Sequence, residues 1–151
     1  EQPGHELIDH LGPEPFDATF DGNYLFELSR GRRCAVKNFV MDGQVVVGAG
    51  NIYAAEALFR AKVRPGRAAG RVTRAEYADI AARIREVLSE AIVQGGTTLR
   101  DFAGANGESG YFQQDLYVYG REGAPCRSCA TPIRRKVIGQ RSSFFCPHCQ
   151  R

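Results

Sequence analysis

Apolar residues recur with helical spacing through much of the first two thirds of the chain. The clearest run follows Thr73, where eight apolar positions keep the i, i+3, i+4, i+7 rhythm of an amphipathic helix. Thr73 and Glu76 have the spacing of a capping box, and Gly95-Gly96 is a helix stop signal. The pattern therefore predicts one long helix between these two signals.

Three shorter helices are predicted upstream by the same criterion. Asn23 is a suitable N-cap for a helix through Arg30. A second helix is expected over residues 34–41, and a third over residues 52–61 with Asn51 as its N-cap. The first 22 residues are rich in proline, glycine and acids, which is typical of a linker that leads into the helical part.

The connection between the second and third of these helices has an unusual composition. Valines occupy positions 45–47 and alone suggest a strand, but the run is short and Gly48-Ala49-Gly50 follows it. We therefore expect a double turn of about nine residues that joins two helices. Main-chain N–H groups around Gly50, at the start of the next helix, suit an anion. A tight turn with an ordinary helix cap explains the same residues.

The C-terminal third has the features of extended structure. Leu116 to Tyr119 alternate aliphatic and aromatic residues and predict a strand. Residues 133–138 and 142–145 predict the two strands of a β-hairpin, with Gly139-Gln140 as its turn. The fold class expected from the whole pattern is mainly α, a helical bundle followed by a small β-hairpin.

Two Cys-x-x-Cys pairs flank the predicted hairpin, with sixteen residues between them. Two such knuckles complete a tetrahedron around one ion, so the spacing predicts a single structural Zn²⁺. The expected ligands are Cys126, Cys129, Cys146 and Cys149. A redox pair, disulfides and an iron–sulfur cluster are the alternatives.

Two further residues with metal-binding side chains lie outside this set. His148 sits inside the second knuckle and is expected to face solvent or a phosphate rather than the metal. Cys34 stands alone in the sequence and is expected to be a buried or half-buried small apolar residue. Neither is therefore assigned a catalytic role.

Composition and charge restrict the partners. An apolar fraction of 43% with 25% charged residues excludes wholesale disorder, and no apolar run reaches the ~18–20 residues of a membrane span. Residues 121–151 hold seven basic residues and one acidic residue. A basic C-terminal third favours nucleic acid, although four thiolates and one zinc ion would offset part of this charge. We expect a monomeric cytoplasmic protein with no membrane partner.

The basic residues of the predicted hairpin are candidates for phosphate contact. Arg141 directly follows the turn, where a guanidinium can project from the hairpin tip and bind a phosphate through two hydrogen bonds. Arg134, Arg135 and Lys136 lie on the preceding strand. A solvated charged surface is the alternative for each of them.

Five segments resemble, in order, the formamidopyrimidine-DNA glycosylase/endonuclease VIII family. The glycine-rich turn Gly48-Ala49-Gly50-Asn51 and the helix after it are similar to the family's helix-two-turns-helix signature. The run Tyr119-Gly120-Arg121-Glu122-Gly123 and the C-terminal cysteines are similar to its zinc finger. The matching segments are residues 45–56, 95–102, 110–112, 115–123 and 139–150.

This resemblance implies a base-excision-repair protein that acts on oxidised purines in double-stranded DNA. It implies that Asn51 and Arg141 hold backbone phosphates, with Lys37 as a further basic position facing DNA. Gly50, Arg134 and Lys136 complete the expected DNA-binding residues. The expected lesion loop, which closes over an extruded base, comprises Asn106, Gly107, Glu108, Ser109, Gly110 and Tyr111.

The family's catalytic residues have no counterpart in this sequence. The chemistry that the resemblance implies, glycosylase and abasic-site lyase, uses an N-terminal proline followed by a glutamate, whereas this chain reads Glu1-Gln2-Pro3. We therefore expect a DNA-binding C-terminal fragment that is inactive alone. The expected division is a linker over residues 1–22, a helix-two-turns-helix domain over 23–115 and a zinc finger over 116–151.

Three alternatives stay open on the sequence. The chain can be a stand-alone nucleic-acid-binding module, because the double turn between helices also resembles one in a ribosomal RNA-binding protein. It can belong to the endonuclease VIII branch, which acts on oxidised pyrimidines. It can also be a zinc-ribbon module that binds proteins.

Overall fold

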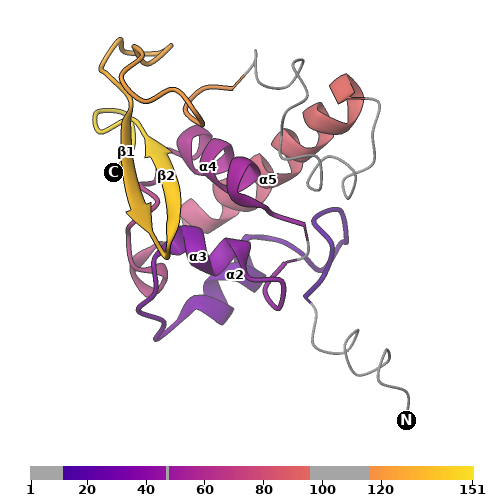
Figure 1. The fold of residues 1–151 in the computed structure, drawn as a ribbon. Helices are drawn as coiled ribbons and strands as arrows, with labels where there is room; N and C mark the ends of the chain where they lie inside the picture. The colour runs from indigo at the N-terminus through magenta and orange to yellow at the C-terminus, as the bar shows by residue number, and fades with distance from the viewer. Residues whose placement is uncertain (1–11, 47, 96–115) are drawn as a thin grey trace.

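The computed structural model describes residues 12–46, 48–95 and 116–151, and its helices precede a two-stranded hairpin (Figure 1). This order confirms the predicted fold class. The helices are α2 (Gly22–Ser29), α3 (Val36–Met41), α4 (Asn51–Arg60) and α5 (Arg74–Gly95), with a short 3-10 helix η1 (Ala69–Arg71), and the strands are β1 (Arg134–Ile138) and β2 (Arg141–Phe145).

The core of the helical part lies where α5 packs against α2 and α4. Tyr77 is fully buried there, donates a hydrogen bond of 2.7 Å to the Ala69 carbonyl, and meets the Phe39 ring edge-on. Gly22 allows α2 to approach α5 closely, because a side chain at this position would collide with the main chain of Ala78. The long helix is therefore the support on which α2 and α4 pack, while α3 packs on α4 and η1.

The capping box predicted for α5 is confirmed. The Glu76 N–H donates to Thr73 Oγ1 at 3.1 Å, and the Thr73 N–H donates to Glu76 Oε1 at 2.9 Å. The same carboxylate accepts two hydrogen bonds of 2.8 Å from Arg67, and this pairing lowers the pKa of Glu76 to about 2. The start of α5 is thereby tied to the loop that precedes η1.

The cap predicted for α2 is wrong. Asp21 caps this helix by accepting the Tyr24 N–H at 2.8 Å, whereas the Asn23 side chain accepts a hydrogen bond from Arg74. The carboxylate of Asp21 reaches the N–H three residues ahead, so the helix starts earlier than the apolar pattern indicates.

Helix α3 starts later than predicted, at Val36. The chain before it is still extended, because the Cys34 carbonyl accepts the Ala69 N–H at 2.8 Å and Ala35 pairs with Ala68 in a β-bridge. Contact with the loop around η1 therefore delays the first helical turn.

The strand predicted at Leu116–Tyr119 is absent, since residues 116–119 form bends and a turn. The main-chain N–H groups of Tyr117, Val118 and Tyr119 all donate to the carboxylate of Glu56, at 2.7 to 2.9 Å. Leu116 and Val118 are buried, which accounts for the apolar pattern. A carboxylate from α4 takes the place of a partner strand.

The hairpin forms as predicted, with Ile138 opposite Arg141 at its closed end. Gly139 and Gln140 both have positive φ, 59° and 68°, which suits a two-residue turn between twisted strands. Strand β2 lies between β1 and α4, so β1 is the outer strand (Figure 1). Among the described residues, no helix is both long and apolar enough to cross a membrane.

Candidate metal centre and nucleic-acid interface

The four predicted cysteine ligands converge at one end of the hairpin. Their sulfur atoms all lie within 4.8 Å of one another, with 3.9 Å between Cys126 and Cys149 and 3.5 Å between Cys129 and Cys146. A tetrahedral site with Zn–S bonds of ~2.3 Å requires sulfur atoms about 3.8 Å apart. The cluster therefore fits one Zn²⁺ bound by four thiolates, and these four residues would hold it with no position left for water.

Hydrogen bonds hold the knuckles in the ligand geometry. The Ser128 N–H donates to Cys126 Sγ at 3.4 Å, and the Cys149 N–H donates to Cys146 Sγ at 3.3 Å. Hydrogen bonds with Thr131 lower the pKa of the Cys129 thiol to about 6, which favours the thiolate that a metal needs. The metal centre is therefore structural in character.

The other two candidates for metal chemistry are not part of this cluster of sulfur atoms. His148 is exposed, in agreement with its prediction. Cys34 is also exposed, so the expectation that it is buried is wrong. It occupies the extended segment before α3, where the main chain is bonded to the η1 region and the side chain is left outside the core.

The finger is fastened to α4 and to the loop after it. At the hairpin tip, Asn51 Nδ2 donates to the Ser142 carbonyl at 3.1 Å. In the middle of α4, Glu56 holds residues 117–119 as described above. Past the end of α4, Gln150 accepts the Cys146 N–H and donates to the Val63 carbonyl, both at 2.8 Å. These bonds fix the hairpin relative to the helices.

The hairpin turn also rests directly on α3. Gly139 lies against the side chain of Asn38, and an added Cβ at Gly139 would overlap that amide. The turn therefore needs glycine both for its positive φ and for this approach. Arg141 is consequently placed next to α3.

Lys37 is the most unusual residue at this junction. It is fully buried, and its Nζ has no hydrogen-bond partner within the described part of the chain. Burial, together with the nearby charge of Arg141, lowers the pKa of Lys37 to about 8. Two cations thus lie close together, and over the described ranges no carboxylate forms an ion pair with either of them. An arrangement of this kind is stabilised by an anion.

Asn51 does not cap α4 with its side chain, so that prediction is wrong. The helix begins at Asn51, its N-cap is Gly50, and no side chain accepts a capping hydrogen bond. The Asn51 amide instead donates to Ser142, while its buried Oδ1 is unpaired among the described residues. The first N–H groups of α4 are therefore left without a side-chain acceptor.

The predicted DNA-binding residues divide into two groups. Lys37, Gly50, Asn51 and Arg141 come together where α3, the start of α4 and the hairpin tip meet. The space in front of Gly50 is open, because a Cβ built there meets no atom within 4 Å. Arg134 and Lys136 are exposed on β1, farther from the tip. The predicted lesion loop, Asn106 to Tyr111, lies outside the described residues.

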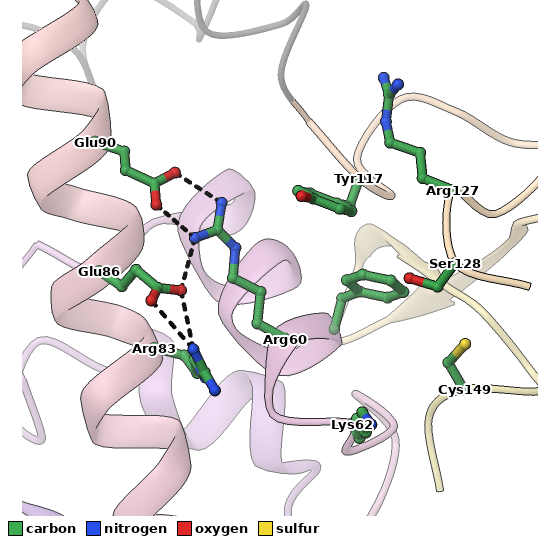
Figure 2. A pocket seen from close by; sticks show the side chains of 10 residues that line it. Arg60, Lys62, Arg83, Glu86, Glu90, Tyr117, Arg127, Ser128 and Cys149 are labelled. Atoms are coloured by element: carbon green, nitrogen blue, oxygen red, sulfur yellow. Dashed lines mark hydrogen bonds and ion pairs between the residues drawn. The ribbon is translucent and has the colours of Figure 1, made fainter.

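A cleft of about 730 Å³ lies between α4, α5 and the first knuckle (Figure 2). Arg60 projects from α4 and donates hydrogen bonds of 2.8 to 2.9 Å to Glu86 and Glu90 of α5. Hydrogen bonds with Glu90 raise the pKa of Arg60. The Tyr117 ring stacks on Phe59 at the other wall. Sequence reasoning missed this network, although glutamates four residues apart on a long helix were a usable signal.

A helix pair joined by a double turn, followed by a four-cysteine hairpin, defines a helix-two-turns-helix protein with a zinc finger. Residues 11–103 match the family model of the formamidopyrimidine-DNA glycosylase H2TH domain, and residues 123–151 match the zinc finger found in FPG and IleRS. The chain therefore belongs to the formamidopyrimidine-DNA glycosylase family.

Relatives agree with this assignment along nearly the whole chain. The formamidopyrimidine-DNA glycosylase of Syntrophotalea carbinolica is 61% identical over 147 residues, which is 97% of this chain and 54% of the relative. That of Alkalilimnicola ehrlichii is 59% identical over 151 residues, again covering 54% of the relative. The chain thus spans about half the length of the curated relatives that it matches.

Solved structures give the same result. The MutM (Fpg) protein of Thermus thermophilus has a TM-score of 0.83 and 40% identity, with 98% of this chain and 56% of that chain covered. Lactococcus lactis formamidopyrimidine-DNA glycosylase, solved noncovalently bound to DNA containing an abasic site, has a TM-score of 0.83 and 30% identity. The alignment covers 98% of this chain and 53% of that one.

Proposed function

We propose that this chain is the DNA-binding part of a base-excision-repair glycosylase and abasic-site lyase that removes oxidised purines. The observation that carries the proposal is the buried Lys37, whose Nζ has no hydrogen-bond partner among the residues that the structure describes, and which lies beside Arg141, close to the start of α4 at Asn51. In this proposal the occupant of the junction is a backbone phosphate of damaged double-stranded DNA.

The energetics favour an anionic ligand. A buried ammonium without a partner is costly, and a second cation nearby adds repulsion. A phosphate removes both costs at once, because it accepts hydrogen bonds from Lys37 and Arg141 and from the N–H groups at the start of α4. The Asn51 amide, already bonded to the hairpin, holds the two sides of the phosphate site at a fixed spacing.

The remaining predicted residues have supporting roles in this proposal. Gly50 leaves room for the DNA backbone, and Arg134 and Lys136 extend the positive field along the finger. Such contacts grip the backbone without reading base sequence. The segment from Asn106 to Tyr111 would close over the extruded base, as the family resemblance implies. The protein would act as a monomer in the bacterial cytoplasm.

We propose further that the chain binds damaged DNA without cleaving it. The chemistry that the family resemblance implies needs a proline with a free amine next to a glutamate, whereas Pro13-Glu14 is internal, and the chain spans about half of its relatives. Borohydride trapping on duplex DNA with an abasic site tests this point. A covalent adduct formed by the wild-type chain would contradict it.

Fluorescence anisotropy with a duplex that carries a tetrahydrofuran abasic-site analogue tests the phosphate site. We expect Arg141→Gln to weaken binding by roughly tenfold, which corresponds to one charge-assisted hydrogen bond. The slope of log affinity against log salt concentration should become shallower by about one. Arg121→Gln is the matched control, because Arg121 is bonded to the carbonyls of Tyr117 and Pro125. Unchanged affinity in both Arg141→Gln and Asn51→Ala would favour a protein-binding zinc ribbon instead.

A further inference from the structure

We propose that the outer edge of β1 binds an acidic peptide in extended conformation, as an added strand of the hairpin. Residues 134–137 are exposed along this strand, and Val137, an aliphatic residue, is 61% exposed. This surface lies apart from the phosphate junction at the hairpin tip and from the metal centre, although its residues Arg134 and Lys136 also belong to the positive field proposed for DNA. Binding of this peptide would be a second function of the chain, beyond DNA binding.

The main chain of β1 has free hydrogen-bonding groups on its outer side. Ile138 and Arg141 close a two-residue turn, so they form a hydrogen-bonded pair, and the pairs alternate from there along the ladder. Arg135 and Val137 therefore direct their N–H and C=O groups away from β2. Across the described ranges, no backbone hydrogen bond connects either residue to another segment. The opposite edge of the hairpin, on β2, already has a partner, because the Ser142 carbonyl accepts a hydrogen bond from the Asn51 side chain.

Side chains beside this edge define the chemistry of the ligand. Lys136 and Ile138 share a face of the hairpin with Phe145, and this face forms a groove of about 210 Å³ with the loop that follows α4. Arg64 and Pro65 line the other wall of the groove. The groove has apolar walls and a cationic rim, so it suits an aliphatic or aromatic side chain flanked by carboxylates.

A peptide fits this edge better than DNA does. A phosphodiester backbone only accepts hydrogen bonds, and it would leave the outward carbonyls of Arg135 and Val137 unpaired. A peptide strand satisfies both kinds of group, in the manner of strand addition. A second copy of β1 is disfavoured because Arg134, Arg135 and Lys136 would face the same cations. Glu122 is the nearby acid, and it is already paired with Arg135 at 3.2 Å.

Val137→Pro is the decisive variant. It removes the outward N–H while every ladder hydrogen bond to β2 is kept, and proline is tolerated on edge strands. Val137→Thr is the matched control, because it keeps the N–H and a β-branched side chain. The probe is a fluorescein-labelled eight-residue peptide that alternates aspartate with isoleucine. A second peptide of the same sequence carries an N-methyl group on every residue, so it has the same side-chain charge but neither of its edges has N–H groups with which to pair.

We expect the wild-type chain and Val137→Thr to bind the first peptide equally in fluorescence anisotropy. Binding should weaken at least tenfold with Val137→Pro or with the N-methylated peptide, while abasic-site duplex affinity stays the same in all three proteins. In the wild-type chain, the peptide should slow hydrogen exchange of the Val137 amide by at least tenfold.

Several results would overturn the proposal. Equal binding of both peptides would mean that charge alone attracts them, and a parallel loss of duplex affinity in Val137→Pro would mean that the main-chain edge of β1 serves DNA rather than a peptide. Failure of the wild-type chain to bind the first peptide at low salt would also reject it. If Val137→Pro does not fold, as judged by zinc content, the N-methylated peptide and the exchange measurement decide the question. The comparison of the two peptides and the exchange measurement do not depend on the proposed phosphate site.

Discussion

Replacing Lys37 with methionine should make the protein more stable and its DNA binding weaker. Lys37 is fully buried, and its Nζ is unpaired within the described residues. Methionine has a similar length and no charge, so it fills the same space without leaving an unsatisfied polar atom. A residue that is costly in the free protein and useful in the complex should show opposite effects in the two measurements.

The magnitude follows from the pKa of Lys37, which falls from 10.5 to about 8. This difference corresponds to roughly 3 kcal/mol against the charged amine at neutral pH. Because the folded pKa is the lower one, the unfolded state binds more protons above pH 8, and wild-type stability rises with pH there. The advantage of Lys37→Met should therefore shrink from roughly 3 kcal/mol at pH 7 to less than half of that at pH 9.5.

Urea unfolding of the two proteins at both pH values tests the stability effect. Fluorescence anisotropy with the abasic-site duplex tests binding, which should weaken by roughly tenfold at pH 7 as one charged phosphate contact is lost. Wild-type affinity should also fall between pH 7 and 9, since the amine then loses its proton. The control is Lys62→Met, because Lys62 is exposed. This change should have little effect on the free energy of unfolding or on duplex affinity. A Lys37→Met protein that is less stable than the wild type at pH 7 would refute the reasoning.

Other parts of the structure give three further predictions. Glu56→Gln should destabilise the protein by about 2 kcal/mol in urea unfolding, because an amide cannot accept hydrogen bonds from all three N–H groups of residues 117–119. The same change at the exposed Glu122 should have little effect. Arg60→Met should cost only about 1 kcal/mol by the same assay, since Glu86 and Glu90 stay partly hydrated. Removing zinc with a chelator should unfold the hairpin, leave most of the helical circular dichroism, and abolish tight duplex binding; a metal-free protein that binds DNA normally would contradict the fixed position of Arg141.

Features set by neighbouring residues were predictable from the sequence. The Thr73–Glu76 capping box and the Gly139-Gln140 turn depend on side chains or φ angles a few residues apart, and both formed. The spacing of the cysteines also predicted their convergence. In each case the local chain contains all of the groups that the interaction needs.

Features that depend on distant partners were not predictable. Leu116–Tyr119 has a strand-like pattern, yet its N–H groups bond to a carboxylate some sixty positions earlier in the chain. Asn51 has the composition of a cap, but its amide bonds to Ser142 instead. Lys37 is likewise buried where the hairpin turn, about a hundred positions later in the chain, lies against α3. No periodicity in one sequence contains such information.

Helix α4 and the loop directly after it hold the finger at its tip, at its base and behind its second knuckle. An assembly held at three separate points keeps the main chain of Arg141 at a fixed place beside α3. While the ligand is absent, the mutual repulsion of the two cations can therefore be relieved by rotation of the exposed Arg141 side chain, but not by movement of the finger as a whole. Departure of a bound duplex would have to begin with movement of the nucleic acid, so its residence time should respond to DNA stiffness more than to protein flexibility.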